Sequence, residues 1–209
     1  MNTKVHELLN QQINKEFYSA YLYLDFSNYF EDAGLDGFAN WYKIQAQEER
    51  DHAMLFYQYL QNENQKVTLE AIDKPDNAFS CHMDVLKAGL DHEKYVTSLI
   101  HNIYAEAYEA KDFRTMQFLD WFVKEQGEEE TNANDLISKM ELFGSDPKSL
   151  YMLNQEPHPI HLLGSTTLVP HPRQRFASVC TCSDVNVERK SLNVSVARPC
   201  LVPGICLFE

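Results

Sequence analysis

The chain has 209 residues, of which 23% are charged and 44% are hydrophobic, and its formal net charge at pH 7 is −13. These proportions are typical of a globular protein with one main domain, and the acidic balance argues against nucleic acid as the main ligand, because phosphate binding needs clusters of lysine and arginine. The acidic charge favours cations as partners, or simply solubility. No stretch is apolar enough to span a membrane and the N-terminus lacks the apolar run of a signal peptide, so we expect a cytoplasmic protein.

The composition changes near residue 156. Residues 1–156 hold 28 aspartates and glutamates against 13 lysines and arginines, and a single cysteine, Cys81, which suits a reducing compartment. Residues 157–209 hold 3 acids against 5 bases, six of the eight prolines and four of the five cysteines. The sequence therefore predicts a main domain over 1–156 and a tail of different character over 157–209.

Helices account for the main domain. Glycine and proline are scarce there, and apolar periodicity predicts four long helices, over about 4–30, 37–62, 79–110 and 113–143, with Asp112 as a candidate N-cap for the last. A short fifth helix is predicted after Pro147. The first and third connections are short, whereas about fifteen residues join the second and third helices. This pattern predicts an all-α four-helix bundle in which one long crossover joins two helical hairpins.

Acidic side chains interrupt the apolar face of every long helix. Alternating steps of four and three residues give faces that are apolar at both ends and polar near the middle, where they carry Glu16, Glu49 with His52, Glu93, and Gln126 with Glu129. Four buried carboxylates at one level would repel one another unless a multivalent cation neutralised them. Carboxylates with one imidazole suit iron or manganese better than zinc or copper, and four acids indicate two ions that share a bridging carboxylate.

Each of these residues has a simpler explanation when it is taken alone. A single glutamate on such a face is more often a flank residue, and His52 alone is more often a hydrogen-bonded core histidine. Tyr23, one heptad after Glu16, fits core packing as well as a role near a metal. Agreement across all four helices favours metal binding, but a structural bundle whose inward acids are incidental stays open.

With these residues placed, residues 1–156 resemble the bacterial non-haem ferritins. The matching segments are NKEFYSAYLYL, AQEERDHA, DHEK and FLDWFVKEQGEEE, one from each long helix. The resemblance implies a ferritin-like bundle with a ferroxidase centre for two iron ions. Its first site would use Glu16, Glu49 and His52, and its second site would use Glu93, Glu129 and the bridging Glu49.

The resemblance also implies residues around this pair. Gln126 would lie beside the two ions and Tyr23 near them, with a redox role. Bacterial members carry a third iron site, which here would use Glu48, Glu125, Glu128 and Glu129. Haem is not expected, because Arg50 stands where the haem-binding bacterioferritins carry their methionine ligand.

The function that the resemblance implies is iron storage. The chain would oxidise Fe(II) to Fe(III) with O2 or H2O2 and store ferric oxyhydroxide inside a shell of 24 subunits. A di-iron peroxidase that stores no mineral is an alternative. The tail does not favour the rubrerythrin-like peroxidases, because its C-x-C and C-x5-C spacings match their four-thiolate site poorly.

The tail, residues 157–209, resembles nothing in this family. We expect it to be an incidental extension, such as a frameshift or read-through product, that stays largely disordered. The alternative is an appendage that binds a partner or handles iron, for which His158, His161 and His171 are the candidate ligands. Because the fifth helix of this family packs around the fourfold axes of the shell, the tail bears directly on assembly.

Overall fold

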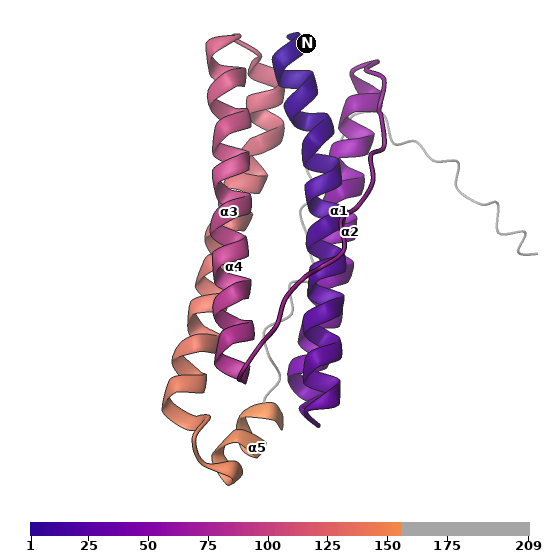
Figure 1. The fold of residues 1–209 in the computed structure, drawn as a ribbon. Coiled ribbons are helices and arrows are strands. Elements are labelled where there is room, and N and C mark those ends of the chain that lie inside the picture. Colours follow the sequence, from indigo (N-terminus) through magenta and orange to yellow (C-terminus); the bar gives the residue numbers. More distant parts are fainter. Residues whose placement is uncertain (156–209) are drawn as a thin grey trace, which may run out of the picture. The chain divides into compact units, whose positions relative to one another are not determined.

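A computed structural model of the chain describes residues 1–155. They form five helices and no strand: α1 (Thr3–Asp32), α2 (Asp36–Asn62), α3 (His82–Glu109), α4 (Phe113–Phe143) and α5 (Pro147–Gln155) (Figure 1). The predicted all-α bundle, with its short fifth helix, is confirmed. The predicted tail lies outside the described residues, so the division at residue 156 stays a prediction. Within residues 1–155, no helix is both long enough and apolar enough to cross a membrane.

Short connections join α1 to α2 and α3 to α4, so each pair forms an antiparallel helical hairpin. Gly34 has a φ of 72°, a left-handed conformation that glycine adopts without strain, and it turns the chain from α1 into α2. Between α3 and α4, the Asp112 side chain accepts a hydrogen bond from the backbone N–H of Thr115 at 3.2 Å, so the predicted N-cap of α4 is confirmed. The helices of each hairpin lie side by side (Figure 1).

The crossover between α2 and α3 runs along α1 (Figure 1). His6, Asn10 and Asn14, spaced four residues apart on one face of α1, hydrogen-bond the crossover backbone at Lys66, Thr68 and Ala71 over 2.8–2.9 Å. These bonds satisfy backbone groups that no sheet or helix pairs. The long crossover that the sequence predicted is therefore confirmed.

The start of α3 differs from the prediction. The sequence predicted a helix from about Phe79, whereas α3 begins at His82. The carboxylate of Asp84 accepts hydrogen bonds from the backbone N–H groups of Ser80 and Cys81 at 3.0 and 3.2 Å. This side chain satisfies N–H groups at the helix start, and Cys81, the N-cap residue, has an extended backbone conformation.

Two apolar clusters form the core, one toward each end of the bundle. The first centres on aromatic side chains that include Phe26, Phe30 and Phe38. The second holds Phe56 and Phe122 with aliphatic residues of all four long helices. The buried acids of the four helices belong to neither cluster and occupy the middle of each helix. The bundle therefore has a polar layer between two apolar ones.

The short helix α5 packs on the start of α2. The side-chain oxygen of Asn154 accepts hydrogen bonds from the backbone N–H groups of Gly37 at 2.9 Å and Phe38 at 3.3 Å. Leu35, at the N-cap position of α2, offers no side-chain cap, so Asn154, which lies 117 positions after Gly37, takes that role. Leu153 is buried beside it.

Candidate metal centre

The acids that the sequence predicted to face inward are buried in the polar layer. Each long helix contributes at least one of them, and all five predicted ligands of the two-ion centre are between 1% and 3% exposed: Glu16, Glu49, His52, Glu93 and Glu129. The side chains reach this layer because each lies one or two helical turns from an apolar residue of the same face.

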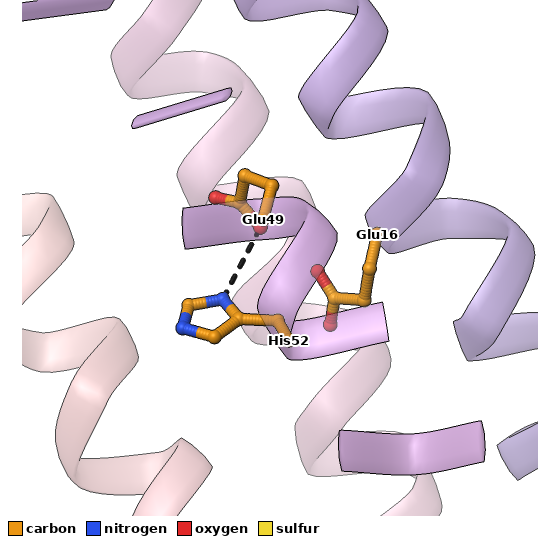
Figure 2. Close-up of side chains that lie close together, drawn as sticks. All are labelled: Glu16, Glu49 and His52. Atoms are coloured by element: carbon orange, nitrogen blue, oxygen red, sulfur yellow. Dashed lines mark hydrogen bonds and ion pairs between the residues drawn. The ribbon is translucent and has the colours of Figure 1, made fainter. Parts of the chain in front are cut away.

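Glu16, Glu49 and His52 come together as the first predicted site requires. Each offers one ligand atom, and these atoms all lie within 4.8 Å of one another. Glu49 and His52 are three residues apart on one face of α2, with His52 Nδ1 3.3 Å from Glu49 Oε2, and Glu16 approaches from α1 (Figure 2). Gln12, four residues before Glu16, donates to Glu16 Oε1 at 2.9 Å.

Two atoms of this group have no hydrogen-bond partner. Glu16 Oε2 and His52 Nε2 are fully buried, yet neither accepts or donates a hydrogen bond. A buried polar atom without a partner costs about 1–3 kcal/mol, and more when it is charged. Two carboxylates and an imidazole with free lone pairs at this spacing therefore fit a metal ion.

Glu93 and Glu129, predicted for the second site, are held by neutral donors. The Tyr23 hydroxyl donates to Glu93 Oε1, and the Gln126 amide donates to Glu93 Oε2 at 3.1 Å. The Gln45 amide donates to Glu129 Oε2 at 2.9 Å. None of these donors carries a positive charge, so the hydrogen bonds do not neutralise either carboxylate.

Gln45 and Gln12 are the site residues that sequence reasoning missed. Gln45 lies four residues before Glu49 on the same face of α2. Its hydrogen bond to Glu129 joins two helices, so no pattern within α2 predicts it. Gln12 did have a local signal, since it precedes Glu16 by four residues on α1.

Burial and mutual repulsion raise the pKa values of the clustered acids. Burial is the main cause for Glu16, with a further contribution from the charge of Glu49. Burial also raises the pKa of Glu49 and that of Glu129, and in both cases the Glu93 charge adds to the effect. Carboxylates in this condition take up protons unless a cation neutralises them, and a cation would reverse the direction of these shifts.

Glu48 and Glu125 form a second group with His52. Their ligand atoms also lie within 4.8 Å of one another, and Glu48 and Glu125 are 4% and 6% exposed. Neither oxygen of Glu48 has a hydrogen-bond partner, and burial raises the pKa of Glu48 to about 7. Glu128, expected in the same site, instead pairs with Lys124 at 2.6 Å, and its side chain is 34% exposed.

Comparison with known proteins identifies the family. The family model of the ferritin-like domain matches residues 6–143. A bacterial non-heme ferritin of Campylobacter jejuni is 35% identical over 155 residues, which are 74% of this chain and 93% of that protein. A probable bacterial non-heme ferritin-like protein of Haemophilus influenzae is 32% identical over 156 residues, which are 75% and 94%.

Solved structures agree with these relatives. An open pore ferritin from the hyperthermophilic archaeon Archaeoglobus fulgidus superimposes with a TM-score of 0.74 and 40% sequence identity, over 76% of this chain and 96% of that chain. The matched family, the sequence relatives and the shared bundle confirm the resemblance that the sequence motifs indicated. The chain belongs to the ferritin family.

Proposed function

We propose that this chain is an iron-storage ferritin that oxidises Fe(II), its substrate, at the buried acids of the polar layer. The observation that carries the proposal is the group formed by Glu16, Glu49 and His52. Their ligand atoms lie within 4.8 Å of one another, and two of the buried atoms have no hydrogen-bond partner. Buried polar atoms without partners are rare in stable folds, and a bound metal ion would supply the missing partner for both.

The centre is proposed to hold two iron ions. Glu16, Glu49 and His52 bind the first, and Glu93 and Glu129 bind the second with Glu49 as the bridge. Oxygen-rich anionic ligands favour Fe(III) over Fe(II), which promotes oxidation. Each Fe(II) loses one electron, and O2 gains both electrons and two protons to give H2O2. With H2O2 as the oxidant, two electrons and two protons give two water molecules.

Neighbouring residues are proposed to position these ligands. Gln126 and Tyr23 fix the two oxygens of Glu93, and Gln45 fixes one oxygen of Glu129. Tyr23 is also our candidate for a redox-active side chain, because its hydroxyl contacts a proposed iron ligand directly. The third iron site that the resemblance implies, over Glu48, Glu125, Glu128 and Glu129, stays a prediction, and no haem is expected.

Storage is proposed to occur inside a shell of 24 subunits. Family membership supports this proposal, as does the near-complete coverage of relatives that are named ferritins. The oxidised iron would then collect in the shell as ferric oxyhydroxide. A di-iron peroxidase would oxidise Fe(II) without accumulating mineral, and a purely structural bundle would do neither.

The test is aerobic addition of Fe(II) to the metal-free protein, with O2 uptake followed over time. Glu49→Gln should lower the rate at least about tenfold, because it removes the charge of the bridging ligand without changing the shape of the side chain. Glu109→Gln, at the exposed end of α3, is the matched control and should oxidise iron at the wild-type rate. Wild-type rates in Glu49→Gln would contradict the proposed centre.

Electron microscopy of the same samples separates the alternatives. Hollow particles that fill with dense mineral after Fe(II) addition support storage. Iron oxidation without mineral supports the peroxidase, and protein that takes up no iron supports the structural bundle.

A further inference from the structure

Thr97 lies beside the buried acids and makes a hydrogen bond that is unusual for a threonine inside a helix. It follows Glu93 by four residues on α3, so the two side chains share one face of that helix. A helical threonine often donates its hydroxyl hydrogen to the carbonyl oxygen four residues earlier, which here belongs to Glu93. The Thr97 hydroxyl instead donates to Glu130 Oε1 of α4 at 2.7 Å.

Glu130 fixes the direction of this hydrogen bond. A carboxylate accepts hydrogen bonds and donates none, and a hydroxyl group has a single hydrogen to donate. While Thr97 gives that hydrogen to Glu130, its oxygen offers only lone pairs to other side chains. Thr97 and Glu130 are half-buried, whereas Glu93 and Gln126 are buried. The pair therefore extends the polar layer outward between α3 and α4.

The side-chain amide of Gln126 meets three acceptors at this place. Its nitrogen lies 3.1 Å from Glu93 Oε2, 3.3 Å from the Glu93 backbone oxygen and 3.4 Å from the Thr97 hydroxyl oxygen. The amide nitrogen has two hydrogens to share among them. Because Thr97 donates its only hydrogen to Glu130, it does not compete with Gln126 for the Glu93 carbonyl oxygen. The nitrogen of Gln126, and not its oxygen, is thereby kept against Glu93.

We propose that Thr97 and Glu130 are positioning residues, which hold the Gln126 amide against Glu93 and so fix the carboxylate of the second iron site. The inference rests on the proposed function, because it assigns both residues a role toward the two-ion centre. Neither residue binds an ion itself, and both act through Gln126. The first site does not depend on these hydrogen bonds, since its ligands lie on α1 and α2. The two sites should therefore respond differently to changes at Thr97.

Zn²⁺ is the probe, because it binds carboxylate and imidazole ligands and is not oxidised. Its binding to the metal-free full-length chain is measured by calorimetry. Thr97→Val replaces the hydroxyl group with a methyl group, and it should weaken one bound ion by about 10- to 100-fold while the ion at the first site binds as before. Thr97→Ser keeps the hydroxyl group and should restore wild-type binding.

Thr131→Val is the matched control for the loss of a threonine hydroxyl. Thr131 is exposed on α4 and donates to the Gly127 backbone oxygen at 2.8 Å, which is the ordinary bond to the fourth residue before it. This variant should bind both ions as the wild type does. Wild-type binding of both ions in Thr97→Val would overturn the inference, as would equal weakening in Thr97→Val and Thr131→Val.

Variants of Glu130 distinguish a hydrogen-bond acceptor from a metal ligand. Glu130→Gln keeps an oxygen that can accept from Thr97, so both ions should bind with nearly wild-type affinity. Glu130→Ala removes the acceptor and should weaken the same ion as Thr97→Val does. If Glu130→Gln weakens that ion as much as Glu130→Ala, the carboxylate charge matters and the positioning role is wrong.

Crystal structures of the metal-free variants give a readout that a general loss of stability would not produce. In Thr97→Val and Glu130→Ala the Gln126 nitrogen should lie beyond about 3.5 Å from Glu93 Oε2, and in Thr97→Ser it should stay within hydrogen-bonding distance. Thermal melting checks that every variant is folded. An unmoved Gln126 amide in both Thr97→Val and Glu130→Ala would contradict the inference.

Glu93→Gln keeps the inference separate from the proposed two-ion centre, because it changes a ligand of the second site directly. If Glu93→Gln weakens one ion while Thr97→Val does not, the centre stands and the positioning roles are wrong. If Glu93→Gln binds both ions as the wild type does, the proposed second site is wrong and the inference falls with it. Weakening of the same ion in both variants supports the inference.

Discussion

At Glu48, burial couples the stability of the metal-free chain to pH. Burial raises the pKa of its carboxyl group to about 7, whereas an unfolded glutamate titrates near its ordinary pKa of about 4.3. Between these values the folded chain holds a proton that the unfolded chain has lost, so stability falls as the pH rises from about 4.3 to 7. The raised pKa values of Glu16, Glu49 and Glu129 act in the same direction. We expect the metal-free chain to melt at a higher temperature at pH 5 than at pH 8.

Glu48→Gln tests this assignment. Glutamine has nearly the shape of the protonated carboxyl group and never ionises, so the variant should melt with the wild type at pH 4, where both the folded and the unfolded carboxyl group are largely protonated. At pH 8 it should be more stable, by up to about 3 kcal/mol. Thermal melting of the wild type and the variant at the two pH values, in the presence of a metal chelator, measures these differences. Glu70→Gln, on the exposed crossover, is the control. Parallel wild-type and Glu48→Gln curves across this pH range would contradict the role of Glu48.

Single residues also show how far the sequence predicts the site. The inward position of Glu16, Glu49, Glu93 and Glu129 followed from helical periodicity, because a face repeated over seven turns leaves little freedom of register. The ion pair between Glu128 and Lys124 did not follow from periodicity, because it depends on the side-chain torsions of both residues.

Among the elements, the junction of α5 and α2 gives the sharpest prediction. A Cβ atom on Gly37 would lie 1.8 Å from the backbone oxygen of Asn154, so no other residue fits while α5 stays docked. Gly37→Ala should displace α5 and destabilise the fold by about 1–3 kcal/mol. Hydrogen exchange of residues 147–155 measures the displacement, and thermal melting measures the loss.

Gly127 supplies the matched control. It lies within α4, and nothing is within 4 Å of the Cβ that a substitution would add. Gly127→Ala should therefore stabilise the helix by about 0.5–1 kcal/mol without changing exchange in α5. Asn154→Ala should loosen α5 as Gly37→Ala does, at a cost of about 1 kcal/mol, since it removes the cap of α2. Unchanged exchange of α5 in both Gly37→Ala and Asn154→Ala would refute this docking.

The elements themselves were largely predictable, and the exceptions have physical causes. Apolar periodicity and the scarcity of glycine and proline located five helices, and Asp112 marked the start of α4. The start of α3 was missed because Phe79 continues the apolar pattern, while the capping by Asp84 overrides it. The docking of α5 was not predictable, since the bond from Gly37 to Asn154 joins residues far apart in the chain.

At the scale of the whole molecule, the described residues contain a complete core. Both apolar clusters and the polar layer between them lie within residues 5–153. The relatives make the same point, because about 155 residues of this chain match 93% of the Campylobacter jejuni ferritin. The lengths of the helices and of their connections predicted this bundle. Assembly into a shell depends on contacts between copies of the chain, which the periodicity of a single chain does not predict.

A chain that ends at residue 156 should therefore fold and oxidise iron as the full-length chain does. It keeps every residue of the core and of the proposed centre, so its melting temperature should change by less than about 2 °C, equivalent to under roughly 1 kcal/mol. It should also form hollow particles at least as readily, because each copy then carries 53 fewer residues beyond α5 to accommodate. Circular dichroism, O2 uptake and electron microscopy of the two chains measured side by side check these three expectations. If the shortened chain unfolds, or no longer assembles under conditions in which the full-length chain does, residues 157–209 contribute to folding or to assembly.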